Sequence, residues 1–348
     1  MDIKIVDVAA KAGVSPATVS RVLNNNSNVT ANTKEKVMKV IEELGYQPNA
    51  AAKNLRSQRS MIIGVIVPEI NNSYYAEIIK GIENKAYAQK YKVIICDTGN
   101  NKEKELDFIS LLMNKTADSM ILVTPLLSDE ELCHIADMSY LIGVVGRHID
   151  HHNIPCVYTD NVKFSKDVVS HLVQQGHRKI AFLSGYADAV DSYERLEGYL
   201  KALREHHIPF HPELIENGDF SEKGGYEAIK RLVEKQADFT AVYAANDEMA
   251  LGVYKACAEL DIRIPDQLAV VGVDNNRISR YIQPKLSTVS QPKIKMGRAI
   301  VEKLIEQLEH GEPSQERVLV LDSELMIRES SLAPVPGPSG SSPVTPGS

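Results

Sequence analysis

The sequence predicts a multi-domain protein, in which an all-α head and a short connector precede a two-lobed α/β core with parallel sheets. Apolar residues recur with helical periodicity over residues 1–46, whereas from residue 61 continuously apolar runs alternate with helical stretches. The charge divides at the same place. Residues 1–60 hold nine Lys or Arg and five Asp or Glu, a net charge of +4, and the rest of the chain carries −11.

The head is expected to contain three short helices. Gly13 ends the first helix, Ser15 suits the N-cap of the second with Pro16 at its first position, and Gly45 ends a third helix that follows Thr30. The residues expected to face inward are Ile5, Val8, Ala9, Ala12, Val19, Val22, Leu23, Val37, Val40, Ile41 and Leu44. Two short helices joined by a tight turn containing Gly and followed by a third are typical of a helix-turn-helix domain, here residues 1–46.

Two segments lack a packed pattern. The basic connector 47–60 has an alanine-rich centre, but it is shorter than the ~12–15 residues that an isolated helix needs in water, so we expect it to fold only against a partner. The tail 333–348 is a Pro, Gly and Ser sequence that cannot form a packed element, and it could be an artificial extension.

The core, residues 61–332, is expected to hold strands that are continuously apolar and alternate with helices, as in parallel sheets covered on both faces. Its length exceeds what one sheet usually takes, so two α/β lobes are expected. The expected strands are 62–67, 93–96, 120–123, 141–145, 156–158, 180–183, 241–244 and 268–273.

Composition excludes several classes of protein. No apolar run approaches the ~18 residues of a membrane span, and the N-terminus lacks the pattern of a secretory signal. The four cysteines lie far apart without a CxxC pair, so neither a zinc site nor a disulfide framework is expected, and a reducing cytoplasm is the simplest location. A basic head on an acidic body indicates that one end of the chain contacts nucleic acid.

Many motifs, in order, resemble those of the lactose-repressor (LacI/GalR) family of regulators. In the head they are 5–9, 12–15, 18–24, GYQPNA at 45–50, Ala52 and Leu55. In the body they are 74–77, 159–161, GHRKIA at 176–181, 195–199, NDEMA at 246–250, 272–275, 286–289 and 291–292. The resemblance covers about residues 3–330, which makes chance agreement very improbable.

The resemblance implies a hinge helix over 47–60 and a core like the periplasmic sugar-binding proteins, with a ligand in the cleft between two lobes. Three crossovers would join the lobes near Asn161, near 289–292 and near 321–323. The first lobe would then comprise about 61–160 and 291–322, and the second about 161–290 and 323–332. Ligands of open α/β sheets bind beyond the carboxyl ends of the strands, which agrees with this placement.

The second helix of the head is expected to read DNA. Thr18, Ser20 and Arg21 lie on its outer face, where a helix in the major groove needs hydrogen-bond donors, although a solvated helix face would look the same. The resemblance implies that Leu55 wedges between bases in the minor groove. The full expected DNA-binding set is Ser15, Pro16, Ala17, Thr18, Ser20, Arg21, Asn24, Asn49, Ala52, Leu55 and Arg56.

The resemblance also implies an effector site. Arg195 would meet a sugar hydroxyl or carboxylate, and Asp274 would supply an opposing acceptor. The full expected set is Tyr74, Tyr75, Asp160, Arg195, Phe220, Asn246 and Asp274. Asp160 and Asn246 would equally suit caps of the helices that follow them, and the sequence leaves these two roles open.

Two positions depart from the family pattern and leave the effector open. Gly146 stands where many sugar-responsive members have Asp, and Ser221 stands where a purine-responsive member would have an acidic residue. His148, His151 and His152 resemble a metal cluster only superficially, so no metal and no cofactor is expected.

The sequence is therefore interpreted as a cytoplasmic, ligand-responsive transcription regulator, a repressor, that binds operator DNA as a homodimer and responds to a sugar or related metabolite. The alternatives are an α/β enzyme and a periplasmic-type binding protein without DNA binding. The chain lacks the GxSxG, P-loop, GxGxxG and HExxH motifs, which counts against an enzyme. The basic head and the missing signal count against both alternatives.

Overall fold

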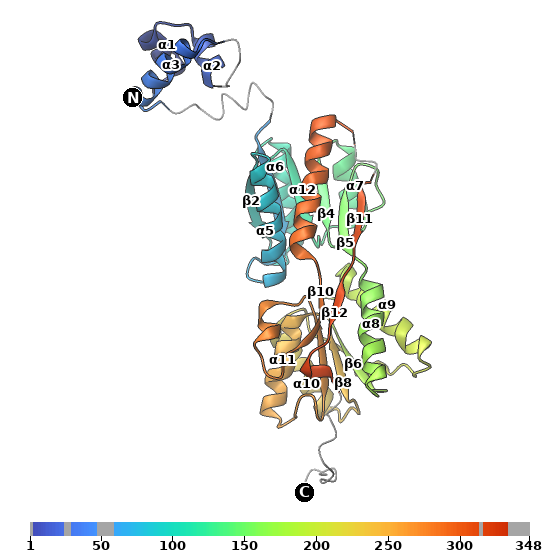
Figure 1. Ribbon diagram of the computed structural model, residues 1–348. Coiled ribbons are helices and arrows are strands. Elements are labelled where there is room, and N and C mark those ends of the chain that lie inside the picture. The colour runs from blue at the N-terminus through green and yellow to red at the C-terminus, as the bar shows by residue number, and fades with distance from the viewer. Residues whose placement is uncertain (1–2, 24–28, 47–58, 313–315, 333–348) are drawn as a thin grey trace. The chain divides into compact units, whose positions relative to one another are not determined.

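The computed structural model describes residues 3–23, 29–46, 59–312 and 316–332 (Figure 1). It divides into two compact units, the head Met1–Met61 and the core Ile62–Ser348, which are considered separately. The described residues leave out most of the hinge predicted at 47–60 and the tail 333–348. They also leave out five of the expected DNA contacts, Asn24, Asn49, Ala52, Leu55 and Arg56. None of the described helices is long and apolar enough to cross a membrane.

The head contains the three expected helices, α1 (Ile5–Ala12), α2 (Pro16–Leu23) and α3 (Ala31–Leu44). Gly13 and Gly45 end α1 and α3 with φ values of 63° and 62°, a left-handed conformation that glycine adopts without a steric penalty. The Thr30 side chain accepts a hydrogen bond from the backbone N–H of Thr33 and caps α3. One apolar cluster holds the three helices together, with Val8, Ala9, Ala12, Val19, Val22, Val37 and Val40 buried.

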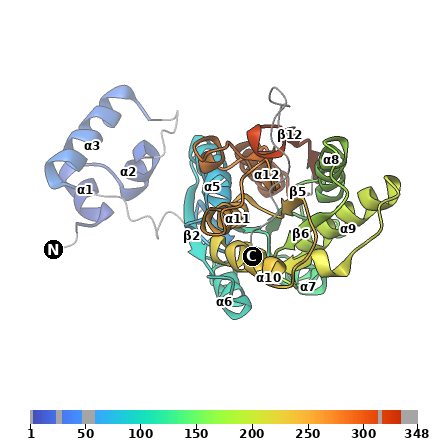
Figure 2. The same cartoon turned by 90° about the horizontal axis from the view of Figure 1, so that it is seen from below.

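The first lobe of the core is built on a six-stranded sheet in the order β11-β5-β4-β3-β1-β2, with all pairs parallel. Its strands are β1 (Ile62–Val67), β2 (Lys92–Asp97), β3 (Ser119–Val123), β4 (Ile142–Val145), β5 (Cys156–Thr159) and β11 (Val318–Leu321). Figure 2 shows α5 (Ser73–Ala88) and α12 (Lys293–His310) on one side of this sheet, and α6 (Lys102–Met113) and α7 (Asp129–Asp137) on the other. Helices thus cover both faces, as expected for a parallel sheet.

The second lobe has a sheet in the order β12-β10-β9-β8-β6-β7. Its strands are β6 (Ile180–Ser184), β7 (Ile215–Asn217), β8 (Ala241–Ala244), β9 (Ala269–Val273), β10 (Ser287–Ser290) and β12 (Glu324–Met326). Two helix pairs cover it, α8 (Asn161–Gln174) with α9 (Val190–Glu205), and α10 (Glu222–Glu234) with α11 (Asp247–Glu259) (Figure 2). Short 3₁₀ helices span Pro212–Leu214, Arg277–Arg280 and Glu329–Ser331.

Both sheets are parallel as expected except at one edge, where β12 runs antiparallel to β10. The connectivity explains this. β11 runs parallel to the other strands of the first sheet and ends at their carboxyl edge, and the chain then enters the second sheet directly. It enters at the edge where the parallel strands end, so it must run in the opposite direction.

Three connections join the lobes, from β5 to α8, from β10 to α12 and from β11 to β12. They lie at Asp160, at 291–292 and at 322–323. The carboxyl ends of the parallel strands in both sheets therefore point toward the junction between the lobes, where such sheets place their ligands.

Candidate functional site: the outer face of the second head helix and a pocket between the core lobes

The outer face of α2 carries the residues expected to contact DNA. Ser15 Oγ accepts a hydrogen bond of 3.1 Å from the backbone N–H of Thr18 and lies 2.9 Å from the Thr18 hydroxyl. Ser15, Pro16, Ala17 and Arg21 are exposed, whereas Thr18 and Ser20 are half-buried. The helix start is thus fixed by its cap, and Arg21 projects from the exposed face.

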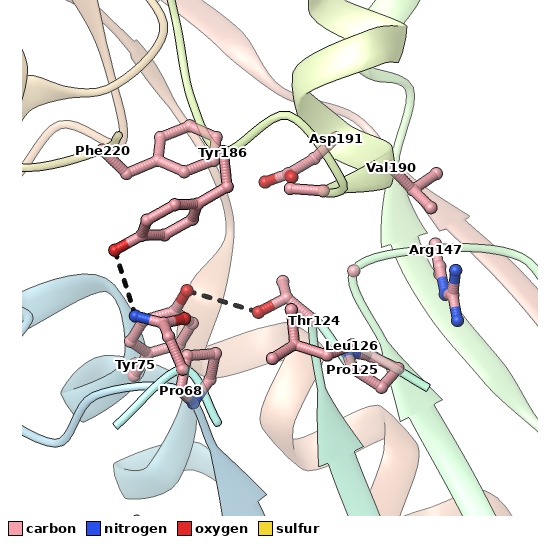
Figure 3. Close-up of a pocket in the computed structure, with 13 residues that line it drawn as sticks. Pro68, Tyr75, Thr124, Pro125, Leu126, Arg147, Tyr186, Val190, Asp191 and Phe220 are labelled. Carbon is pink, nitrogen blue, oxygen red and sulfur yellow. Dashed lines mark hydrogen bonds between the residues drawn. The ribbon is translucent and has the colours of Figure 1, made fainter. Parts of the chain in front are cut away.

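A hollow of about 450 Å³ lies between the two core lobes (Figure 3). The first lobe contributes Pro68, Tyr75, Asn100, Thr124, Pro125, Leu126, Gly146 and Arg147 to its lining, and the second lobe contributes Tyr186, Ala189, Val190, Asp191 and Phe220. Both lobes therefore build the pocket, and a ligand in it would contact both.

The second-lobe wall is aromatic. The rings of Tyr186 and Phe220 meet edge to face with centroids 5.8 Å apart. Asn100 Nδ2 of the first lobe donates a hydrogen bond of 3.1 Å to the Tyr186 hydroxyl, so a direct contact joins the lobes at the pocket (Figure 3). A Cβ at Gly185 would lie 1.9 Å from the Phe220 ring, so a glycine is needed for this ring position.

Gly146 lies in the first-lobe wall, where a neighbouring side chain leaves little room for a Cβ. Gly146 has a φ of +109°, and a Cβ there would lie 2.8 Å from Cγ2 of Thr124. The Thr124 hydroxyl donates a hydrogen bond of 3.3 Å to the Tyr75 hydroxyl (Figure 3). A Cβ at position 146 would thus meet the Thr124 methyl group, and Tyr75 and Thr124 supply hydroxyl groups on this wall.

Buried charges hold the loop after β3. Glu105 accepts hydrogen bonds from the backbone N–H groups of Leu126 (3.0 Å) and Leu127 (3.3 Å). Arg147 donates to the Leu127 carbonyl oxygen and lies 3.3 Å from Asp129. Burial raises the pKa of Glu105 despite these backbone hydrogen bonds. This arrangement fixes Leu126, which lines the pocket.

Arg195 lies behind the second-lobe wall, next to the lining residues Asp191 and Phe220, and is only 4% exposed. Its Nη2 lies 3.4 Å from Asp191 Oδ2, its Nε donates to Asn161 Oδ1 at 3.0 Å, and its Nη1 donates to the Ala245 carbonyl oxygen. Its Cζ lies 5.6 Å from the centroid of the Phe220 ring. Burial lowers the pKa of Arg195, but the carboxylates of Asp191 and Asp274 outweigh burial and raise it overall.

Asp274 follows β9 and is 4% exposed, with a φ of +111°. Burial raises its pKa to about 6, although Arg195 and Lys293 act in the opposite direction. Its Oδ1 accepts a hydrogen bond of 2.9 Å from Gln291 Nε2. Tyr74, whose ring contacts Tyr75 at 5.2 Å, is also buried, and burial together with Asp274 raises its pKa.

The structure thus separates the seven expected effector residues into three groups. Tyr75 and Phe220 line the pocket. Tyr74, Arg195 and Asp274 are buried next to lining residues or interact electrostatically with them. Asp160 and Asn246 cap α8 and α11 by accepting from the backbone N–H groups of Lys163 and Met249, so the structure shows the capping role for both.

Asp160 is exposed and does not line the pocket. Asn246 also donates from Nδ2 to the Phe220 carbonyl oxygen at 2.8 Å, which ties α11 to a pocket residue.

Sequence reasoning missed several pocket residues, among them Asn100, Thr124, Tyr186 and Asp191. Thr124 and Tyr186 come within two residues of a strand end, and Asn100 comes three residues after β2. Asp191 precedes Arg195 by one helical turn. The rule that ligands lie beyond strand ends, and the pairing of charges four residues apart on a helix, could have found them.

The described part of the chain contains neither a metal-binding cluster nor a disulfide. No group of three or more His, Cys, Asp or Glu there is arranged to hold a metal ion. His151 instead lies 3.0 Å from Asp137 and contacts the ring of His152. Cys96, Cys133, Cys156 and Cys257 are all free thiols.

Comparison with known proteins identifies both parts of the chain. Residues 169–331 match the periplasmic binding protein-like domain, and residues 4–49 match the bacterial regulatory proteins of the lacI family. The chain therefore combines a head of the lacI regulatory type with a periplasmic-binding-protein-like core.

Relatives match over nearly the whole chain. Catabolite control protein A of Priestia megaterium is 34% identical over 331 residues, which span 95% of this chain and 99% of that protein. The crystal structure of the lac repressor dimer bound to operator and the anti-inducer ONPF has a TM-score of 0.87 at 28% identity and covers 96% of this chain and 100% of that chain. The complex of the transcriptional regulator CelR with cellobiose has a TM-score of 0.71 at 29% identity, covering 94% and 99%. The chain belongs to the lacI family of bacterial regulatory proteins.

Proposed function

We propose that this regulator is a cytoplasmic repressor that binds a near-palindromic operator as a homodimer and is switched by a sugar or related metabolite in the inter-lobe pocket. The observation that carries the proposal is that one chain combines a capped helix-turn-helix head with a core whose two lobes jointly line a pocket. Effector binding would change the angle between the lobes and thereby the geometry of the DNA-binding end. Inducer and corepressor differ only in which state they favour.

The α2 helices of two heads would lie in successive major grooves, as in other helix-turn-helix dimers. Pro16 and Ala17 are exposed at the start of α2 but carry no side-chain donor, so direct base reading falls mainly to Arg21. Lys and Arg side chains of the head would contact phosphates and make the affinity dependent on salt.

Arg21→Ala should weaken binding to the preferred operator by about 1–3 kcal/mol and relax specificity at one base pair in each half-site. An operator is first selected from a random DNA library with the full chain, and the selection is then repeated with the variant. Lys34→Ala, an exposed cation on α3, is the matched control and should change affinity without changing base preference. An unchanged operator preference for Arg21→Ala would contradict this assignment.

The pocket favours a polar, ring-shaped effector. Tyr186 and Phe220 offer aromatic surfaces, while Asn100, Thr124, Tyr75 and Asp191 offer hydrogen-bonding groups around the same space. A thermal-shift screen of the full chain against sugars, sugar phosphates and purines tests the class of effector, because a tight ligand raises the apparent stability by mass action. Stabilisation by purines alone would contradict the sugar assignment.

Assembly provides a separate prediction. A near-palindromic operator requires two heads, and a two-fold protein matches a two-fold site. We expect a dimer through the core at micromolar concentration, and the same dimeric state when residues 333–348 are deleted. Sedimentation velocity tests this, and a monomer or tetramer would contradict it.

A further inference from the structure

Lys293 is the first residue of α12, and its backbone is held rigidly in the first lobe. α12 packs against α5 so closely that a Cβ at Gly81 would lie 2.3 Å from the carbonyl oxygen of Ile294, and a Cβ at Gly297 would lie 2.2 Å from that of Ile78. Such backbone contact leaves no room for the two helices to slide. The Lys293 backbone must therefore move with the first lobe.

The Lys293 side chain, however, reaches into the second lobe. The residue is only 3% exposed. Its Nζ donates to the carbonyl oxygen of Asp274 at 2.6 Å and to Asn276 Oδ1 at 3.3 Å. On the first-lobe side, Glu77 Oε1 of α5 lies 3.5 Å away. A buried ammonium group thus bridges one lobe and the other.

The acceptors in the second lobe are themselves fixed. The backbone N–H of Asn276 donates to Asp247 Oδ2 at 2.7 Å, and the Thr288 hydroxyl donates to Asp247 Oδ1 at 2.6 Å. Asp247 is fully buried, and burial raises its pKa well above its usual range although the Lys293 charge acts in the opposite direction. The ammonium therefore occupies a rigid, polar socket built from the Asp274 carbonyl oxygen and Asn276 Oδ1.

A second contact to Asp274 comes from the crossover itself. Gln291 accepts a hydrogen bond from the Thr159 hydroxyl at 2.7 Å through Oε1 and donates from Nε2 to Asp274 Oδ1 at 2.9 Å. Thr159 is the last residue of β5 in the first lobe. Asp274, whose backbone has the unusual φ of +111°, is thus held at its carboxylate and at its carbonyl by groups attached to the first lobe.

We propose that Lys293 is a positioning residue: together with Gln291 it clamps Asp274 to the first lobe and thereby fixes the angle between the lobes in the free protein. The clamp acts on the core alone and does not depend on DNA binding. Its link to the effector, through the neighbouring Asp274 carboxylate, rests on the proposed function.

Pulsed electron spin resonance distances between the lobes test the clamp in the full chain without DNA or effector. Spin labels are attached at Glu83→Cys on α5 and Glu227→Cys on α10, both exposed, in a Cys133→Ser background. Labelled protein is mixed with excess unlabelled protein so that distances within one chain dominate. Lys293→Met should at least double the width of the distance distribution or shift its mean, and Lys293→Arg should restore most of the parent distribution.

Two controls separate a clamp from general destabilisation. Lys295→Met removes an exposed charge from the same helix, and Leu304→Ala destabilises the first lobe from a buried position without touching the socket. Both should keep the parent distribution. A Lys293→Met distribution equal to the parent, or an equal broadening in Leu304→Ala, would overturn the proposal.

If Lys293→Met does not fold, the same distance measurement is made on Glu77→Gln. This variant weakens the ion pair between Lys293 and Glu77, and it changes a side chain that is 40% exposed and therefore less important for folding. A broadened distribution in Glu77→Gln supports the clamp, and an unchanged one overturns it. Failure of the operator selection described above would leave these distance measurements intact, so the two proposals fail separately.

Discussion

Arg195→Ala should abolish the effector response while operator binding by the unliganded protein is retained. The guanidinium contacts the second-lobe wall through Asp191 and the Phe220 ring, and it is remote in sequence from the head. Loss of its charge-assisted hydrogen bonds should weaken effector affinity about 100-fold, equivalent to roughly 2.7 kcal/mol. Removing one partner of a buried ion pair also destabilises the fold, by about 3–5 kcal/mol. Titration of the effector found by the thermal-shift screen measures the first effect.

Arg204→Ala is the matched control, because Arg204 lies on the same helix and is exposed. It should leave effector affinity and stability unchanged. The assays are made below the thermal transition of the variant, which is recorded first. Loss of both operator binding and the thermal transition in Arg195→Ala would show that the residue is structural, and a normal effector affinity would show that it lies outside the site.

Asp274→Asn should raise the free energy of unfolding relative to the parent at pH 7.5. The difference between variant and parent at pH 7.5 should exceed the difference at pH 4 by about 1–3 kcal/mol. Burial raises the pKa of Asp274 to about 6, above the value of about 3.9 for an unfolded chain. Because the pKa is higher in the folded state than in the unfolded chain, the protonated carboxyl contributes to the free energy of unfolding, and this contribution is fully present below about pH 4. That contribution is lost as the pH rises to about 6. The uncharged amide does not suffer this loss.

Chemical unfolding of both proteins at several pH values between 4 and 7.5 measures this difference. Asp322→Asn, an almost fully exposed carboxylate, is the control and should show no comparable trend with pH. A difference between Asp274→Asn and the parent that stays constant from pH 4 to 7.5 would contradict a raised pKa for Asp274.

Most of the strands that could be predicted from the sequence are buried on both faces, and the edge strand β2, which is not, was also predicted. β1, β3, β6, β8 and β9 each form a continuous apolar run, and the predicted positions agree with the structure to within a residue or two. β7, β10, β11 and β12 did not appear as strands in the sequence pattern. β7 and β12 are three residues long, β10 reads Ser-Thr-Val-Ser, and β11 lies at a sheet edge with Val320 51% exposed. Such strands form because a neighbouring strand pairs with them. This pairing cannot be predicted from the hydrophobicity of the short segment itself.

The candidate site shows the same division. Arg195 and Asp274 belong to motifs that the family resemblance supplied, and the structure buries both next to the pocket. The inter-lobe contact between Asn100 and Tyr186 joins residues 86 positions apart and has no local signature. The role of Gly146 likewise depends on Thr124, which follows a different strand. Contacts of this kind are set by how the two lobes close on each other.

The three connections between the lobes also determine the order in which the protein can be completed during synthesis. Residues 161–290 leave the ribosome as one uninterrupted stretch and supply all of the second lobe except β12 and the short helix Glu329–Ser331. At that point the first lobe still lacks α12 and β11. These elements are translated more than 130 residues after β5, the strand that pairs with β11. Until they arrive, β5 has an unpaired edge and the α5 surface that packs on α12 is exposed to solvent. The nascent first lobe is therefore the part of this regulator most in need of protection from aggregation, although its sequence is made before that of the second lobe.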